Sequence, residues 1–127
     1  MGADEGAHPA DGEGPVREVY VSRFEIARTT VTNLAFQKFI EATGYQTVAE
    51  QVGSSFVFQG LVDQPGNWPV PRNAPWWREV GGANWMVPFG GNSTIENILD
   101  HPVTHIAFND ALAYCQWSGT RLPREAE

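Results

Sequence analysis

Residues 61–96 form the segment that most limits what this chain can fold into. The segment is rich in Gly, Pro, Asn and Trp and shows no sustained period of 2 or 3.6 residues, so we expect irregular structure there. Loops of this length are uncommon in compact domains unless they are functional or disordered. Five aromatic residues argue against disorder: Trp68, Trp76, Trp77, Trp85 and Phe89. Clustered tryptophans in an ordered loop either fill a core or form the floor of a binding groove.

A helix and a shorter helical turn are predicted before this segment. In "TVTNLAFQKFIEATGY", Thr32 can cap the helix and Gly44 supplies a left-handed stop. One apolar face is expected to carry Phe36, Phe39, Ile40 and Thr43. In "TVAE", Thr47 and Glu50 have the spacing of a capping box, which predicts the second helical start.

Three stretches have the composition or alternation of strands. "REVYVSRFEIA", residues 17–27, alternates, with apolar side chains available for burial at Val19, Val21, Phe24 and Ile26. "SSFVFQG", residues 54–60, is β-branched and aromatic, and "HPVTHIAF", residues 101–108, is expected to be a strand as well. Few long helical patterns and many turn residues therefore predict a fold rich in turns and irregular segments.

A last helix is predicted near the end of the sequence. Asn109 is expected to cap it, with the helix running from Asp110 to about Ser118 and Gly119 stopping it. Its inward residues are expected to be Ala111, Leu112 and Cys115.

Size and charge restrict the classes of partner. The 127 residues suit one domain or part of one, and 42% hydrophobic with 18% charged residues is typical of a globular chain. A net charge of -7 repels phosphate backbones, so we expect no nucleic acid partner, and a cationic peptide would be better received. No apolar run approaches the roughly 20 residues of a membrane span, so no membrane contact is expected. The sequence shows no secretory leader, and the compartment stays open.

Several polar residues are candidates for a catalytic, metal-binding or modification site. On a strand, His101 and His105 would share a face about 13 Å apart, too far for one ion, which favours structural roles. The acidic residues near the N-terminus lack the spacing of a calcium-binding hand and are expected to be solvated: Asp4, Glu5, Asp11 and Glu13. Ser55 lacks the G-x-S-x-G context of a nucleophile. Asn92 matches the N-x-T glycosylation pattern.

Five blocks of sequence occur in the order of a known family. They are "DGEGPVREV", "VTNLAFQKFIEATGYQTVAE", "SSFVFQG", "APWWREVGGANW" and "DHPVTHIAFNDALAYCQWSGTRLPREAE". Together they resemble the formylglycine-generating enzymes, or sulfatase-modifying factors. The resemblance implies a variant of the C-type-lectin-like α+β fold, of which residues 1–127 would be the N-terminal part of a single domain, cut at both ends.

The same resemblance implies an activity and its cofactors. Family members oxidise a cysteine in a sulfatase C-x-P-x-R segment to Cα-formylglycine, using oxygen and copper. The copper lies on two cysteines in the C-terminal part of the domain, and calcium sites lie there too. We therefore expect no catalytic residue, copper site or calcium site in this chain, and the sulfatase polypeptide as the partner. The compartment would be cytoplasmic in a bacterium and the secretory lumen in a eukaryote.

Individual positions can be carried over from the family. The resemblance places Ala49, Ser55 and Trp76 at the substrate groove, although a plain strand-start serine and a packing tryptophan are open alternatives. The position of Ser54 is often aspartate in the family, so one contact to peptide differs here. Cys115 matches a cysteine that pairs with one near the C-terminus in secretory members.

Two alternative functions remain at this stage. Non-catalytic paralogues keep these N-terminal blocks without the cysteine pair and would act as protein-binding modules. Related copies of the fold also occur in iron-dependent sulfoxide synthases, usually beside a His-rich metal domain.

Overall fold

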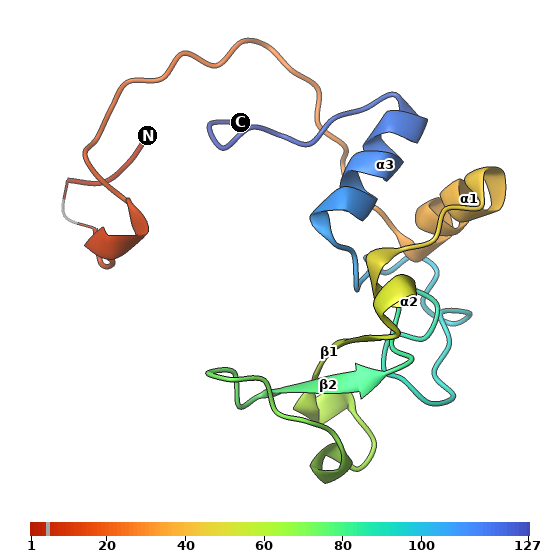
Figure 1. Cartoon of the computed structure of the whole chain (residues 1–127). Coiled ribbons are helices and arrows are strands. Elements are labelled where there is room, and N and C mark those ends of the chain that lie inside the picture. The colour runs from red at the N-terminus through yellow and green to blue at the C-terminus, as the bar shows by residue number, and fades with distance from the viewer. Residues whose placement is uncertain (5) are drawn as a thin grey trace. The chain divides into compact units, whose positions relative to one another are not determined.

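The computed structural model describes residues 1–4 and 6–127, and Glu5, one of the predicted acidic residues, lies outside them. The chain divides into two compact units (Figure 1), Met1–Ala27 with Pro123–Glu127, and Arg28–Leu122. The first unit contains a short 3-10 helix, η1 (Pro9–Asp11). The second contains, in chain order, α1 (Asn33–Thr43), α2 (Val48–Val52), β1 (Ser54–Phe58), η2 (Gln59–Leu61), η3 (Pro65–Asn67), β2 (Trp77–Gly81) and α3 (Phe108–Ser118). Among these described residues, helices and one two-stranded antiparallel sheet are consistent with the α+β class.

Helix α1 begins and ends where the sequence predicts. The Thr32 side chain accepts from the Ala35 N–H at 3.2 Å, and Gly44, at φ 65°, donates to the Ile40 carbonyl at 2.8 Å. Its apolar face is confirmed at Phe36 and Phe39, which are buried, whereas Thr43 is exposed. Helix α2 starts with the predicted capping box of Thr47 and Glu50.

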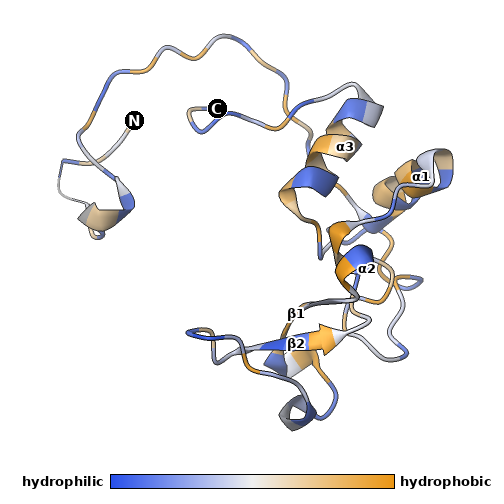
Figure 2. Ribbon diagram, in the orientation of Figure 1, coloured by the Kyte–Doolittle hydropathy of each residue, from blue (hydrophilic) through white to orange (hydrophobic). Residues whose placement is uncertain are grey.

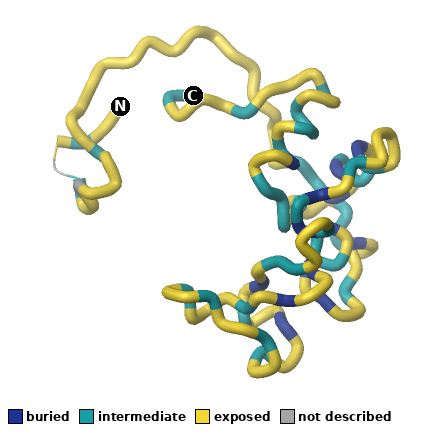
Figure 3. The backbone as a smooth tube through the Cα atoms, in the orientation of Figure 1, coloured by how far each residue is buried: buried dark blue, intermediate teal, exposed yellow. Residues whose placement is uncertain are grey.

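The core of the Arg28–Leu122 unit forms around α1. Its buried members are Phe36, Phe39, Trp85 and Ile95. The Phe36 and Trp85 rings meet edge-on with centroids 5.6 Å apart, and Phe36 stacks on Tyr114 of α3 at 5.9 Å. Figure 3 shows buried backbone at α1 and in the loop segments that approach it. The tryptophan of "GANW" therefore fills a core.

Strand β1 is confirmed, but its partner was not predicted. Strand β2 lies inside the segment that we expected to be irregular and pairs antiparallel with β1, with Ser54 opposite Gly81 and Phe58 opposite Trp77. The strand that β2 bonds to, β1, lies about 20 residues earlier in the chain. The five residues "WREVG" by themselves carry little signal that they form a strand. A second buried cluster anchors the pair: Val57, Val62, Val80 and Ala83.

Two predicted strands are wrong. Residues 17–27 have alternating hydropathy (Figure 2), but their backbone is irregular and the four apolar side chains expected to be buried are exposed. Alternation stabilises a strand only when a neighbouring strand satisfies its N–H and C=O groups. Residues 101–108 form one isolated bridge, Thr32 to Pro102, and His105 has φ 60°, which interrupts any strand.

Helix α3 begins two residues earlier than predicted, and its cap is different. Ala107 is the N-cap residue, and the Asp110 carboxylate, rather than Asn109, accepts its N–H at 2.8 Å. Gly119 ends the helix in the left-handed conformation, as predicted. The inward face also differs, because Leu112 is exposed, whereas Ala113 and Tyr114 pack on the core.

Asp110 joins three segments of the Arg28–Leu122 unit. The side chain is fully buried and accepts from the main-chain N–H groups of Ala107 and Val48 and from the Tyr45 hydroxyl. One carboxylate thus ties the start of α3 to the start of α2. No helix in the described residues is long and apolar enough to cross a bilayer.

Candidate functional site

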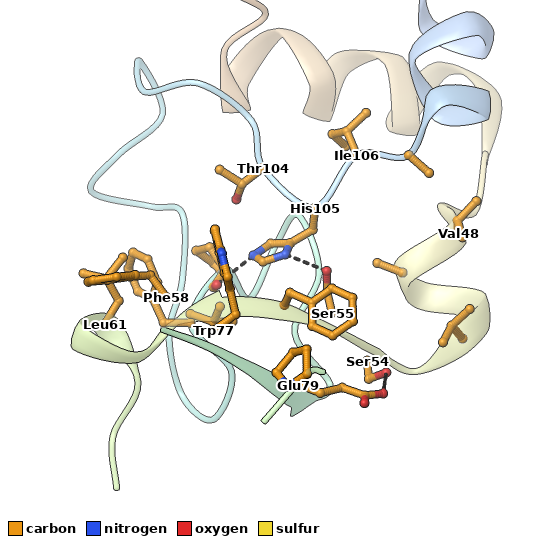
Figure 4. Close-up of a pocket in the computed structure, with 18 of the residues that line it drawn as sticks. Val48, Ser54, Ser55, Phe58, Leu61, Trp77, Glu79, Thr104, His105 and Ile106 are labelled. Carbon is orange, nitrogen blue, oxygen red and sulfur yellow. Dashed lines mark hydrogen bonds between the residues drawn. The ribbon is translucent and has the colours of Figure 1, made fainter. Parts of the chain in front are cut away.

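A cavity of about 830 Å³ opens beside β1 in the Arg28–Leu122 unit (Figure 4). Most of its wall is apolar, contributed by Val48, Ala49, Val52, Phe56, Phe58, Leu61, Trp77, Phe89 and Ile106. Its polar side chains are those of Ser54, Ser55, Glu79, Thr104 and His105. An apolar wall with a few placed polar groups is the usual form of a ligand site.

Two of the three groove residues expected from the family resemblance line this cavity. Ala49 lies on α2 and Ser55 on β1, which follow each other directly in the chain. Trp76 is not among the lining residues, and 51% of its surface is exposed. Its neighbour Trp77 lines the cavity and meets Phe58 edge-on with ring centroids 6.3 Å apart. The assignment of the three residues to a substrate groove stays a prediction.

Arg78 fixes the turn that leads into β2 and carries Trp76 and Trp77. Its guanidinium donates to the carbonyl oxygens of Pro65, Pro75 and Trp77 at 2.9, 2.7 and 2.6 Å, and to Gln59 Oε1 at 2.8 Å. Five N–H groups in a rigid plane let arginine satisfy several carbonyls at once. The corner at the start of β2 is therefore fixed by side-chain bonds as well as by the sheet.

His105 is the most connected polar group of the cavity. Its Nδ1 lies 2.8 Å from Ser55 Oγ and its Nε2 lies 2.8 Å from the Pro88 carbonyl oxygen, as the dashed lines in Figure 4 show. Burial lowers the pKa of His105, and the hydrogen bond to Pro88 opposes that shift in part. A structural role was predicted for this histidine, but no sequence pattern pointed to its contact with Ser55, which lies 50 positions away.

The mouth of the cavity carries one carboxylate among its described lining residues. Glu79 is exposed on β2, and the Ser54 hydroxyl donates to its Oε1 at 3.0 Å across the sheet. No pattern in the sequence singles out Glu79. Its placement depends on the pairing of β1 with β2, which puts Gly81 opposite Ser54.

The predicted distance between the two histidines rested on a strand that does not form. His101 is exposed and its carbonyl accepts from the Asn33 N–H at 2.9 Å, whereas His105 faces the cavity. Among residues 1–4 and 6–127, no three His, Cys, Asp or Glu side chains are grouped so that they could hold a metal ion. In the acidic loop, Glu13 accepts from the His8 N–H at 2.8 Å.

The residues of this chain do not fit a two-thiolate copper site. The sequence has one cysteine, Cys115, which is half-buried on α3. Copper(I) selects soft ligands, and two thiolates cannot come from one copy of a chain with a single thiol. No step of a reaction is therefore assigned to copper bound by these residues.

Comparison with known proteins identifies the family. The family model for the sulfatase-modifying factor enzyme 1-like domain matches residues 1–127. This chain belongs to that family. The formylglycine-generating enzyme of Thermomonospora curvata is 50% identical to it over 128 residues, which cover 99% of this chain and 42% of that protein. The formylglycine-generating enzyme of Bos taurus is 45% identical over 130 residues, which cover 100% of this chain and 35% of that protein.

A relative that is named as inactive has a similar sequence identity to this chain. The inactive C-alpha-formylglycine-generating enzyme 2 of Bos taurus is 48% identical over 120 residues, covering 92% of this chain and 40% of that protein. The chain thus spans well under half the length of these members of the family.

Proposed function

We propose that this chain is part of an enzyme that activates sulfatases by oxidising the cysteine of a C-x-P-x-R segment to Cα-formylglycine. The observation that carries the proposal is the cavity beside β1, found in a chain similar to formylglycine-generating enzymes over its full length. Apolar walls suit the cysteine and proline of such a segment, and Glu79 at the mouth suits its arginine. The net charge of -7 favours a cationic peptide in general.

The substrate groove in this proposal includes Ala49, Ser55 and Trp76. Ala49 and Ser55 line the cavity beside β1, where the small side chain would leave room and the Ser55 hydroxyl would bond an extended peptide backbone. Trp76 offers a half-exposed ring next to the cavity wall at Trp77, where it would contact the peptide beyond the cavity itself. Aromatic area of this kind commonly dominates binding energy at peptide sites.

The proposal extends to the parts of the domain beyond these residues. Residues 1–127 are the N-terminal part of one sulfatase-modifying-factor domain with a variant C-type-lectin-like fold. Copper and calcium are held by other residues of that domain. If the protein enters the secretory route, Cys115 forms a disulfide with a cysteine near the C-terminus of the domain. The matched residues cover 35% and 42% of the lengths of these two relatives.

The test uses the full-length protein that carries this chain. Loaded with Cu(I) and supplied with air and a thiol reductant, it is expected to oxidise the cysteine of a C-x-P-x-R peptide to an aldehyde, with its sulfur released as sulfide and oxygen reduced to water. The product is detected by peptide mass and by an aldehyde-reactive probe. Peptides with serine in place of the cysteine, or with alanine in place of the arginine, are the matched controls. A folded, copper-loaded protein that leaves every C-x-P-x-R peptide unmodified would overturn the proposal.

The second candidate function is a non-catalytic module that binds protein. It is favoured by the 48% identity to a relative named as inactive, which is within the range of the enzymes. The same assay, with peptide affinity measured beside it, separates the two, because a binding module retains affinity for the peptide and forms no aldehyde.

A further inference from the structure

We propose that His105 is a positioning residue, which holds the hydroxyl proton of Ser55 so that Ser55 presents a hydrogen-bond acceptor to a peptide N–H in the cavity. The inference rests on the proposed function, because it names how the same site would recognise a peptide backbone. It gives His105 a role in specificity that neither the sequence pattern nor the similarity to other proteins assigns.

The contact with Pro88 determines which nitrogen of His105 carries a proton. A backbone carbonyl can only accept a hydrogen bond, so the Nε2 atom, 2.8 Å from the Pro88 oxygen, must carry hydrogen. Pro88 is buried, so water does not readily replace this contact. The hydrogen on Nε2 is therefore required by the geometry.

The second nitrogen then has to accept. Burial lowers the pKa of His105, so the ring is neutral near pH 7 and has a single N–H. With that hydrogen on Nε2, Nδ1 has only a lone pair, and the Ser55 hydroxyl, 2.8 Å away, donates to it. The Ser55 oxygen keeps its own lone pairs and has no free proton to offer.

This arrangement decides what Ser55 can recognise. A free serine hydroxyl rotates and can either donate or accept, so it does not distinguish a peptide N–H from a peptide carbonyl. A hydroxyl whose proton is committed to His105 favours the N–H and disfavours a second acceptor. Ser55 lies on β1, whose side chains line the cavity, so the selected N–H belongs to a peptide lying alongside that strand.

The backbone conformation of His105 is consistent with a constraint on the position of its side chain. Its φ of 60° lies in the left-handed region, which is uncommon for residues other than glycine. The two ring contacts, to Ser55 and to Pro88, hold the residue in this conformation. The pair is therefore specified by three segments at once: β1, the Pro88 turn and residues 104–107.

The experiment replaces the backbone N–H groups of the peptide one at a time. Esters in place of single amides of a C-x-P-x-R peptide remove one donor each, and binding and turnover by the full-length protein are measured for the series. One ester is expected to raise Kd or KM about 3–10-fold without changing kcat, the range of one neutral hydrogen bond. In Ser55→Ala the same ester should have no further effect, whereas Ser55→Thr, which keeps the hydroxyl, should retain it.

Variants of His105 separate positioning from packing. In His105→Phe the hydroxyl of Ser55 can turn and donate to the ester oxygen, so the ester penalty should fall below about 2-fold. His105→Asn places an amide oxygen near the former Nδ1 and tolerates positive φ, so it should restore the penalty. A merely structural histidine would change affinity for all peptides of the series equally.

The possible results distinguish this inference from the function on which it rests. If peptides bind and no ester effect depends on Ser55, or if His105→Phe keeps the full penalty, the inference is overturned and the function stands. If His105→Phe does not fold, His105→Gly takes its place, because glycine adopts a φ of 60° without strain and offers no side-chain acceptor to Ser55, and the ester penalty should again fall below about 2-fold. If no C-x-P-x-R peptide binds at all, the proposed function fails and takes this inference with it.

Discussion

Replacing Asp110 should destabilise the protein more than any other single change at the start of α3. Asp110 accepts three hydrogen bonds while fully buried: from Ala107 N–H at 2.8 Å, from Val48 N–H at 3.1 Å and from the Tyr45 hydroxyl at 3.0 Å. In Asp110→Asn only one oxygen remains, so an NH₂ group must face at least one of the three donors. The starts of α2 and α3 then lose part of their common anchor.

The magnitude follows from the bonds that each variant loses. A hydrogen bond to a charged group contributes about 1.5–3 kcal/mol, and a buried donor left unpaired costs about 1–3 kcal/mol. Asp110→Asn loses at least one such bond and should cost about 2–3 kcal/mol of unfolding free energy. Asp110→Ala loses all three but no longer buries a charge, which gives about 3–5 kcal/mol. Tyr45→Phe loses one bond and should cost about 1–2 kcal/mol.

Urea unfolding followed by tryptophan fluorescence measures these differences, and amide hydrogen exchange at Val48 and Ala107 locates them. Asn109→Ala is the matched control, because Asn109 is the exposed neighbour that sequence reasoning named as the cap. It should change stability by less than about 0.5 kcal/mol. If Asn109→Ala costs as much as Asp110→Asn, or exchange at Val48 does not change in Asp110→Asn, the assignment of Asp110 as the shared anchor is refuted.

Three further changes have expected outcomes. Arg78→Lys should lower stability by about 1–3 kcal/mol in urea unfolding, since an ammonium cannot satisfy four acceptors, and an unchanged midpoint would contradict the bonding described. Trp76→Ala should weaken binding of a C-x-P-x-R peptide to the full-length protein more than Trp77→Ala does, measured by titration after both are shown to be folded, and the reverse order would reject Trp76 as the contact. Burial lowers the pKa of His105 in the folded protein, so below the ordinary value of 6.5 the unfolded chain binds more protons than the folded one. The contribution of His105 to stability is therefore complete above that pH and is lost as the pH falls through the folded-state pKa. His105→Asn should flatten that fall between about pH 7 and pH 5 in urea unfolding, and an equally steep fall would show that His105 is not its source.

Much of the candidate site could not be read from the sequence. Ala49 and Ser55 were named from a family resemblance, and both line the cavity, but Trp77, Glu79 and His105 were not named as site residues. The contact between Ser55 and His105 joins positions 50 apart, and the one between Ser54 and Glu79 joins positions 25 apart. Local composition does not predict either contact, because each contact depends on how two separate segments of the chain are placed in the fold.

By itself, the sequence determined the parts of the fold that are stabilised within a few residues. The cap of α1 at Thr32, the capping box of α2 and the glycine stops at Gly44 and Gly119 depend on hydrogen bonds that span three or four positions, so their residue types carry the signal. Tertiary structure decided the rest. Residues 77–81 became a strand because β1 satisfies their backbone, whereas residues 17–27, with a clearer alternation, stayed irregular. Asp110 took the capping role from Asn109 because its carboxylate also reaches Val48 and Tyr45, and bonds between segments far apart in the chain outweigh a local preference worth about 1 kcal/mol.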